Sequence, residues 1–339
     1  MKIITCAGYH GTGSSIVTDI LKEFDNCKSF GEYEFRFIQD PYGIADLEYN
    51  LVENNHRLNS SNAIKKYKKN IDFLSGNKLI PKYEKYFEGN FKKISYEYID
   101  DLTNIKYKAQ WHQDLIEKGK LYYTFYKIVT RLVTLILRKI KNKDEICFEL
   151  NSNEEFYLSY PEDMFYEKTI KYIDKLMECL NKENKEFLAL DQLVPPSNCE
   201  RYLKYFRDLK IIVVDRDPRD LFILEKKYWK DKVIPTDNIS DFIEWYKITR
   251  KHIKNEIDND RVLRVKFEDF IYDYENSMDL IKSFLNLSDS NHKMKKQFFN
   301  PENSIRNTRL WLKNTEFEKE IKKIELELKD FCYEYENCF

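Results

Sequence analysis

The sequence predicts an α/β fold, a P-loop doubly wound parallel sheet with a large helical insertion. Three observations lead to this fold class. A short β-branched strand runs into a glycine-rich turn and then a helix at 2–24, which is the context that gives a P-loop motif its meaning. The continuous β-branched run at 210–215 is typical of a parallel strand covered on both faces. Strands also alternate with helices from about residue 187 onward.

The first elements follow directly from the residue pattern. A strand is expected over 2–7, because the run is short, apolar and ends in glycine. A helix is expected over 16–24, because Ile16, Val17, Ile20, Leu21 and Phe24 share one helical face. A second short strand is expected at 27–30.

The middle of the chain, about 45–180, is long, charged and helical, with few glycines or prolines. It contains no internal repeat and no Pro/Gly/Ser-rich linker, so we expect a helical insertion between strands and not a tethered domain. The expected helices are 44–55, 61–75, 81–89, 109–141 and 161–181.

The α/β alternation returns after this insertion. Further strands are expected at 187–191, 210–215 and 262–267, and helices at 199–206, 239–257, 277–285 and 315–336, with a loop at 299–314. The chain therefore reads as one domain over 1–339, with a core of 1–40 and 185–315 and a C-terminal helix at 315–336. In such a sheet, ligands bind at the carboxyl ends of the strands.

Charge and composition exclude some classes of function. The 57 Lys and Arg residues are balanced by 58 Asp and Glu residues, so no general basic field attracts nucleic acid. The densest basic patch, 64–69, is interpreted as a solvated helix face, with a polyanion contact as the alternative.

The seven cysteines form no CxxC pair, which argues against a disulfide framework or a zinc site. Scattered thiols are typical of a reducing compartment. The apolar stretch 121–140 is interrupted by Lys127, Arg131 and Arg138, so it predicts a buried or amphipathic helix and not a transmembrane segment. With no signal peptide in the N-terminal residues, these features predict a cytoplasmic protein.

The glycine turn carries the first chemical motif. Its residues, Gly8-Tyr9-His10-Gly11-Thr12-Gly13-Ser14-Ser15, have the GxxxxG spacing followed by two hydroxyl residues. Glycines let backbone N–H groups turn inward, and the following helix adds its positive end, so the turn suits the charged 5′ group of a nucleotide. Ser14 stands where a kinase or NTPase P-loop has lysine. The alternative is a glycine-rich turn with no ligand.

The second motif lies just past the strand at 210–215 and reads Asp215-Arg216-Asp217-Pro218-Arg219-Asp220. At this position the Arg216 side chain would point into the ligand crevice, where its planar guanidinium group could bind a phosphate through two hydrogen bonds. Two alternatives stay open: Asp215 as a magnesium ligand of an NTPase, or a salt bridge in a surface loop.

Together these motifs resemble those of the sulfotransferases that use 3′-phosphoadenosine-5′-phosphosulfate (PAPS). The resemblance covers about 1–40 and 185–315 and is weak in the helical middle. It rests on the order and spacing of four segments: Thr12-Gly13-Ser14-Ser15, Arg216 to Asp220, Lys266-Phe267-Glu268-Asp269, and Ser304 to Lys313.

The resemblance implies roles for these residues. Gly11, Thr12, Gly13, Ser14 and Ser15 would hold the 5′-phosphosulfate, and Arg216 the 3′-phosphate. The C-terminal loop would close over the nucleotide through Arg306, Asn307 and Arg309.

The sequence departs from the family at two positions. Gly11 stands where the family has lysine or arginine, and the adjacent His10 could supply the missing donor. Leu224 stands where the family has a serine.

Transfer to a hydroxyl also needs a general base. The segment 29–36 resembles the Gly-Glu-Glu-x-Arg segment of tyrosylprotein-type sulfotransferases. This resemblance implies Glu32 as the base, Glu34 as its alternative and Arg36 as a sulfate or substrate contact. An ordinary solvated carboxylate would look the same, and His112 matches the histidine base of cytosolic sulfotransferases only in residue type.

The function expected from this resemblance is sulfuryl transfer from PAPS to a hydroxyl acceptor, with no metal. The acceptor is expected to be a sugar of a glycan or glycolipid, because aromatic side chains such as those of the insertion often stack on sugar rings. The alternatives are a divergent P-loop kinase or NTPase, and a non-catalytic relative that binds nucleotide or glycan.

Overall fold

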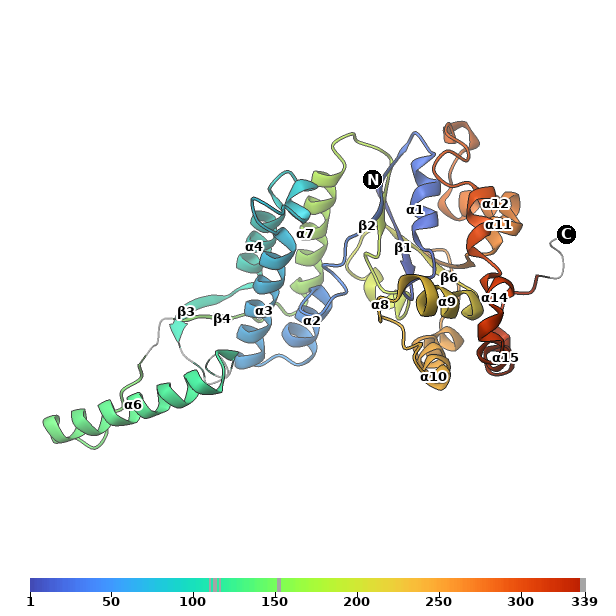
Figure 1. Cartoon of the computed structure of the whole chain (residues 1–339). Coiled ribbons are helices and arrows are strands. Elements are labelled where there is room, and N and C mark those ends of the chain that lie inside the picture. The colour runs from blue at the N-terminus through green and yellow to red at the C-terminus, as the bar shows by residue number, and fades with distance from the viewer. Residues whose placement is uncertain (110, 112–114, 116, 151–153, 336–339) are drawn as a thin grey trace.

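A five-stranded parallel sheet forms the centre of the computed structural model, which describes residues 1–109, 111, 115, 117–150 and 154–335 (Figure 1). The strand order is β2-β5-β1-β6-β7. The strands are β1 Lys2–Gly8, β2 Cys27–Glu34, β5 Phe187–Asp191, β6 Leu209–Asp215 and β7 Val262–Lys266. The expected doubly wound parallel sheet is therefore confirmed.

Both faces of this sheet are covered, because alternate residues of each strand enter different apolar clusters. Ile3 and Ile211 pack in a cluster that continues into the insertion. Ile4 and Ile212 pack in a second cluster with α1 (Ser15–Lys22) and α12 (Tyr274–Leu285). Burial on both faces explains the continuous apolar run at 211–214 in β6.

The remaining helices of the core surround the sheet and its carboxyl edge. They are α8 Cys199–Leu203, α9 Pro218–Ile223, α10 Ile239–Thr249, α11 Asp269–Tyr272, α13 Pro301–Ser304, α14 Leu310–Lys313 and α15 Glu318–Glu327.

Three expectations for this half of the chain are corrected. The helix expected at 239–257 ends at Thr249, because the next residue, Arg250, turns its side chain into a buried ion pair with Asp215. The helix expected at 315–336 is limited to α15, and the chain after it is drawn toward Asp217, whose carboxylate accepts from the N–H of Tyr333. The segment 299–314 is not one loop but holds α13 and α14.

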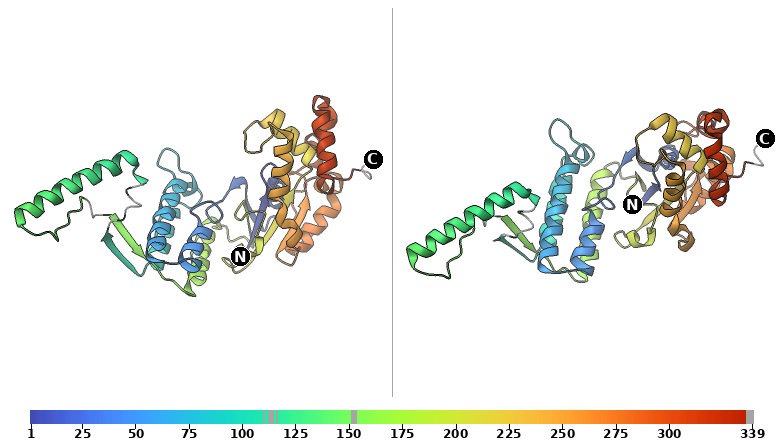
Figure 2. Two further views of the ribbon diagram at one scale, coloured as in Figure 1. Left: turned by 90° about the horizontal axis from the view of Figure 1, so that it is seen from below. Right: turned by 60° about the horizontal axis from the view of Figure 1, so that its bottom comes forward.

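The insertion leaves the sheet after β2 and returns at β5. Figures 1 and 2 show it as a group of helices beside the sheet, with α6 at the end farthest from it. Its elements are α2 Ile44–Glu48, α3 Arg57–Ser75, α4 Phe91–Leu102, β3 Ile105–Ala109, α6 Lys120–Lys141, β4 Glu154–Leu158 and α7 Met164–Leu180.

The expected helix pattern is wrong in two places here. The segment 81–89 forms only the 3-10 turn Tyr83–Lys85, and its Glu84 carboxylate accepts from the N–H groups at the start of α4, which the sequence interpretation missed. The single helix expected over 109–141 is not formed: 105–109 is β3, which pairs with β4 in antiparallel orientation, and the long helix α6 begins at Lys120. His112 lies outside the described residues.

The aromatic richness of the insertion is explained by its core. Tyr98 and Tyr172 stack with ring centroids 4.3 Å apart, and the Tyr67 hydroxyl donates to that of Tyr172 over 3.0 Å. All three rings are buried. Such aromatic residues therefore stabilise the insertion and give no support to a sugar-binding role.

The basic patch at 64–69 lies on α3 and carries local partners. Lys69 forms an ion pair with Glu117 at 2.8 Å, and Lys68 donates to the hydroxyl of Tyr157 at 2.9 Å. These contacts agree with a helix face that is neutralised within the insertion.

Candidate functional site

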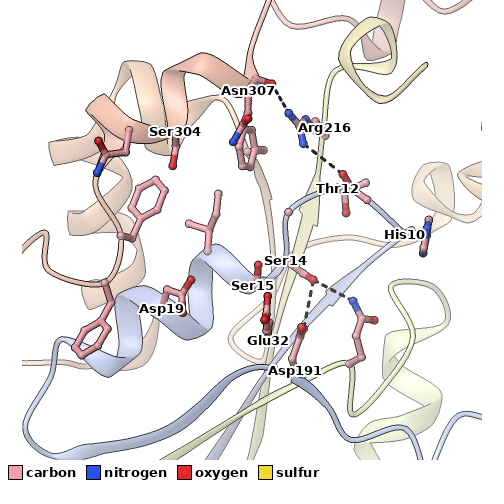
Figure 3. Close-up of a pocket in the computed structure, with 18 of the residues that line it drawn as sticks. His10, Thr12, Ser14, Ser15, Asp19, Glu32, Asp191, Arg216, Ser304 and Asn307 are labelled. Atoms are coloured by element: carbon pink, nitrogen blue, oxygen red, sulfur yellow. Dashed lines mark hydrogen bonds between the residues drawn. The ribbon is translucent and has the colours of Figure 1, made fainter. Parts of the chain in front are cut away.

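A cavity of about 970 Å³ opens at the carboxyl edge of the sheet (Figure 3). It joins the glycine turn after β1 to the ends of β2, β5 and β6 and to a segment near the C-terminus. Its lining consists of 10–16, Asp19, Glu32, Glu34, 191–192, Arg216, 228–229, Asp231, Phe267, 296–300, 303–304 and Asn307. The sequence-predicted turn and Arg216 therefore meet at one cavity.

The glycine turn adopts a conformation that few residues tolerate. The φ angles are 71° at His10, 67° at Gly11 and 82° at Gly13. A Cβ atom on Gly13 would lie 2.5 Å from the ring of Phe267, and one on Gly11 would lie 2.5 Å from Trp229. Left-handed backbone and close packing together account for both glycines.

The turn offers several unused hydrogen-bond donors. Within the described part of the chain, the N–H groups of residues 11–15 donate to no protein acceptor. Ser15 begins α1, so the helix N-terminus adds its partial positive charge to the same place. Converging N–H groups at a helix N-terminus form an anion-binding turn.

Asp191 and Gln192, which the sequence interpretation missed, lie under the turn at the end of β5. The Ser14 hydroxyl donates to the Asp191 carboxylate over 3.3 Å and accepts from the Gln192 amide over 3.0 Å (Figure 3). Burial raises the pKa of Asp191 to about 6. The sequence did offer one signal for this position, because Asp191 is a polar residue at the end of the apolar run 187–190.

Arg216 closes the side of the cavity opposite Asp191. Its guanidinium donates to the carbonyl oxygens of Gly11, at 3.5 Å, and Asn307, and lies 4.3 Å from the ring centre of Phe267. Burial lowers its pKa from the ordinary arginine value. Its Nε is buried and has no protein partner among the described residues, so a charged donor remains available beside the turn.

Asp215 does not face the cavity. Its carboxylate forms an ion pair with Arg250 at 2.8 Å and lies 3.9 Å from Lys266. Burial by itself would raise the pKa of Asp215, but these two positive charges outweigh it and hold the pKa below the ordinary value. The alternative in which Asp215 binds magnesium is therefore not supported by its position.

The rest of the 215–220 motif anchors the C-terminal segment. Asp220 accepts from the N–H groups of Arg309 and Leu310, at 3.1 and 2.7 Å. Arg219 donates to the carboxylates of Asp217 and Glu325. The motif thus holds the segment that contains Asn307 against the cavity, and it is not a solvated loop salt bridge.

Glu32 and Glu34 both line the cavity from β2. The pairing of β2 with β5 is irregular between Ser29 and Glu34, so the strand bulges where Glu32 leaves it. Such bulges commonly re-aim a side chain beside a site. Arg36 lies outside the lining and binds Asp40 at 2.8 Å and Glu34 at 3.4 Å.

His10 lies at the cavity rim, where its Nε2 is 3.2 Å from the Asp231 carboxylate. Its ring also contacts Trp229 edge-on. Leu224 is buried in an apolar cluster with Leu221 and Phe222 and does not reach the cavity. The side chain at the position where the family resemblance implies a serine is therefore apolar and lies outside the cavity.

The three residues predicted in the C-terminal loop, Arg306, Asn307 and Arg309, do not all lie at this cavity. Asn307 lines the cavity, whereas Arg306 is exposed and lies outside the lining. Arg309 lines a different cavity of about 660 Å³, where its guanidinium stacks 4.4 Å from the ring centre of Tyr335. Its backbone is turned by a φ of 52°, which directs the side chain away from Asn307.

A second wall of the cavity, the segment 296–300, was not predicted. Glu23, buried at the end of α1, accepts from the N–H groups of Lys296, Phe298 and Phe299, each within 3.1 Å. It also bonds the His292 ring at 2.8 Å. One carboxylate thus fixes the segment that brings Lys296 and two phenylalanines to the cavity.

The charged lining is mostly acidic. Asp19, Glu32, Glu34, Asp191 and Asp231 face Arg216 and Lys296. An anion bound here would therefore depend on the N–H groups of the turn and on Arg216, on the side of the cavity away from β2. Among the described residues, no group of three or more potential metal-ligating side chains is found.

No protein-family model and no curated protein matches the sequence. Several solved structures resemble this chain in fold, including the following three. The sulfotransferase domain from the curacin biosynthetic pathway is 12% identical, with 88% of this chain and 77% of that one covered and a TM-score of 0.39. The sulfotransferase STF9 from Mycobacterium avium is 13% identical (91% and 68% covered, TM-score 0.35). Retinol dehydratase, in complex with androsterone and inactive cofactor PAP, is 14% identical (90% and 66%, TM-score 0.32).

Because every one of these TM-scores is below 0.5, no residue role is carried from these structures to this chain. The chemistry of the cavity rests on its own residues.

Proposed function

We propose that this protein is a sulfotransferase that moves a sulfuryl group from PAPS to a hydroxyl acceptor. One observation carries the proposal: the Arg216 guanidinium contacts the carbonyl of Gly11, so a lysine-less P-loop and a buried arginine from another strand border one cavity. Two anion-binding groups on one cavity suit a ligand with two separate anionic groups. The 5′-phosphosulfate and the 3′-phosphate of PAPS are such groups.

The residues would divide the reaction between them. The N–H groups of 11–15 bind the 5′-phosphosulfate, and Arg216 binds the 3′-phosphate. Glu32 removes the proton of the acceptor hydroxyl as its oxygen bonds to sulfur. As the bond from sulfur to the 5′-phosphate oxygen breaks, the N–H donors stabilise the charge on the departing 3′-phosphoadenosine-5′-phosphate (PAP). Glu34 lines the same cavity and is the alternative base.

The finer assignment of the acceptor as a sugar is supported by Tyr228 and Trp229. Both line the cavity, and both keep about half of their surface exposed, at 53% and 44%. Exposed aromatic faces at a cavity can stack on sugar rings. We propose a cytoplasmic location on the basis of the free thiols Cys6, Cys27 and Cys199.

Calorimetric titration of the full chain with PAP and with Mg-ATP tests the proposal. We expect PAP to bind at least tenfold more tightly than Mg-ATP, because only PAP places a phosphate at Arg216. Preferential binding of Mg-ATP would overturn the sulfotransferase assignment. PAP binding without transfer from PAPS to any member of a panel of hydroxyl acceptors would instead favour a non-catalytic relative.

A magnesium-nucleotide phosphotransferase is the second candidate, and the position of Asp191 favours it. Magnesium in P-loop enzymes is held by a P-loop hydroxyl and an aspartate at a strand end. The Ser14–Asp191 contact provides such a pair of oxygens. Residues Ser14 and Asp191 would then hold the ion together with the nucleotide phosphates.

A further inference from the structure

The longest helix of the insertion, α6, leaves most of its apolar side chains uncovered. Leu121, Phe125 and Ile140 expose 89%, 60% and 73% of their surface. Ile128, Leu132, Leu135 and Ile136 are each more than half exposed. Among the described residues of α6, only Tyr126 and Thr130 are buried. Seven large apolar side chains on one helix are far more than the scattered exposed residues of ordinary surfaces.

These side chains form one continuous face. Residues 121, 125, 128, 132 and 135 follow the alternating spacing of four and three that keeps side chains on one side of a helix. A different side of α6 is already used: Phe148 donates its N–H to the Thr134 hydroxyl at 3.1 Å, and Tyr126 donates to Glu149. These contacts fix the orientation of α6 against residues 148–149, while its apolar face remains exposed to solvent.

The charge of α6 is entirely of one sign. The helix contains six basic residues and no acidic residue: Lys120, Lys127, Arg131, Arg138, Lys139 and Lys141. None of the six forms an ion pair within the described part of the chain. Lys120, Lys127, Arg131 and Arg138 are spaced by seven, four and seven residues, so they form a stripe along one side of the apolar face. In a chain of net charge −1, this is a strong local concentration of positive charge.

This combination identifies the partner by its chemistry. A second copy of α6 would bring two all-basic helices together with no acidic residue to pair with, which opposes self-association. No helix among the described residues is long and apolar enough to cross a membrane. A basic amphipathic helix instead suits the plane of an anionic lipid surface, where apolar side chains enter the acyl boundary and Lys and Arg contact the headgroups.

We propose that α6 docks the protein on the surface of a membrane that contains anionic lipids. The proposal is independent of the reaction at the nucleotide cavity. Helix α6 lies at the end of the insertion farthest from the sheet, so the cavity lies outside the proposed contact with the membrane (Figure 1).

Sedimentation with vesicles tests this docking. The full chain is mixed with vesicles of phosphatidylcholine alone or with 30% phosphatidylglycerol, at low and high salt. We expect binding to the anionic vesicles to be at least tenfold tighter than to neutral ones, and to weaken with salt. Two variants address the two faces: K127Q/R131Q removes charge, and I128Q/L132Q/L135Q removes apolar surface. Each should lower binding to anionic vesicles on the order of tenfold.

Matched controls remove equal charge and equal apolar surface elsewhere. K251Q/K254Q changes two exposed lysines, and I248Q/I257Q/L326Q changes three exposed apolar residues. Both should bind vesicles like the unchanged protein, and circular dichroism should report equal helix content in all variants. Absence of binding to anionic vesicles, or an equal loss in controls and α6 variants, would overturn the proposal. Two other results would also overturn it. One is a dimer in light scattering that I128Q/L132Q/L135Q dissociates, when neither the dimer nor the variant binds vesicles. The other is tighter binding of the protein to single-stranded DNA than to anionic vesicles.

Discussion

The Ser14 hydroxyl donates to the Asp191 carboxylate over 3.3 Å at the base of the cavity, and burial raises the pKa of that carboxyl to about 6. The folded protein therefore holds this proton more tightly than the unfolded chain, whose pKa is the ordinary 3.8. The stability that this group contributes is fully present below the unfolded pKa and is lost as pH rises through the folded pKa. D191N should remove that decline, which urea unfolding from pH 4 to pH 8 would measure.

The same proton should also affect nucleotide binding. Above pH 6 the Asp191 carboxylate carries a negative charge beside the turn, so PAP should bind D191N about tenfold more tightly than the unchanged protein. The advantage of D191N should disappear at pH 5. A magnesium-nucleotide enzyme would behave in the opposite way, with D191N losing affinity for Mg-ATP above pH 6.

Gly13 should tolerate no side chain. G13A places a Cβ against the Phe267 ring at a φ of 82°, so PAP binding should be lost and the free energy of unfolding should fall by about 1–3 kcal/mol. Gly89 is the matched control, because its φ is 76° but nothing lies within 4 Å of an added Cβ. G89A should cost about 1 kcal/mol and leave PAP binding unchanged. Equal loss of binding in both variants would contradict a specific role for the turn.

Arg216 should recognise the 3′-phosphate specifically. R216Q should weaken PAP binding about 100-fold, since charge-assisted hydrogen bonds are lost, and should change AMP binding less than threefold. AMP lacks the 3′-phosphate, so it serves as the control for damage to the turn. If both ligands lost affinity equally in calorimetry, Arg216 would support the cavity only structurally.

Glu32 and Glu34 can be separated as candidate bases. E32Q should lower the transfer rate from PAPS by roughly 10²–10⁴-fold while PAP affinity stays within threefold, because the base acts on the acceptor and not on the donor. E34Q is the matched variant from the same strand and should retain most of the rate. A large loss in E34Q alone would move the role to Glu34.

Glu23 should control the segment 296–300 without touching the ligand. E23Q leaves N–H donors of that segment poorly satisfied, so the free energy of unfolding should fall by about 2 kcal/mol and PAP affinity should decrease. Glu275, which lies 3.7 Å from the Lys296 ammonium on the surface, provides the control. E275Q should change neither quantity, and a PAP affinity unaltered in E23Q would show that the segment is not part of the nucleotide site.

The sheet and the turn could be predicted because their signals are local. Residues 211–214 of β6 are all apolar because both faces of the sheet are covered, and the glycine spacing at 8–13 is contained in one short segment. The pairing of β3 with β4 was missed because α6 lies between the two strands in the sequence. In addition, the five residues of each strand have no distinctive pattern. The register of this pairing depends on long-range packing that single residues do not report.

In the site, too, only the residues with a local signal could be predicted. Arg216 could be placed because it follows the end of a strong strand. Arg309 could not, because its direction depends on a left-handed backbone held by Asp220 from a distant segment. The wall at 296–300 likewise depends on Glu23, which is 273 positions away from Lys296 in the chain.

The walls of the cavity come from segments far apart in the sequence, because the Glu23 carboxylate accepts from the N–H of Lys296, 273 positions later. During translation, the first wall emerges from the ribosome long before the second exists. The cavity can therefore take its final form only after the segment 296–300 has been synthesised and has reached the Glu23 carboxylate.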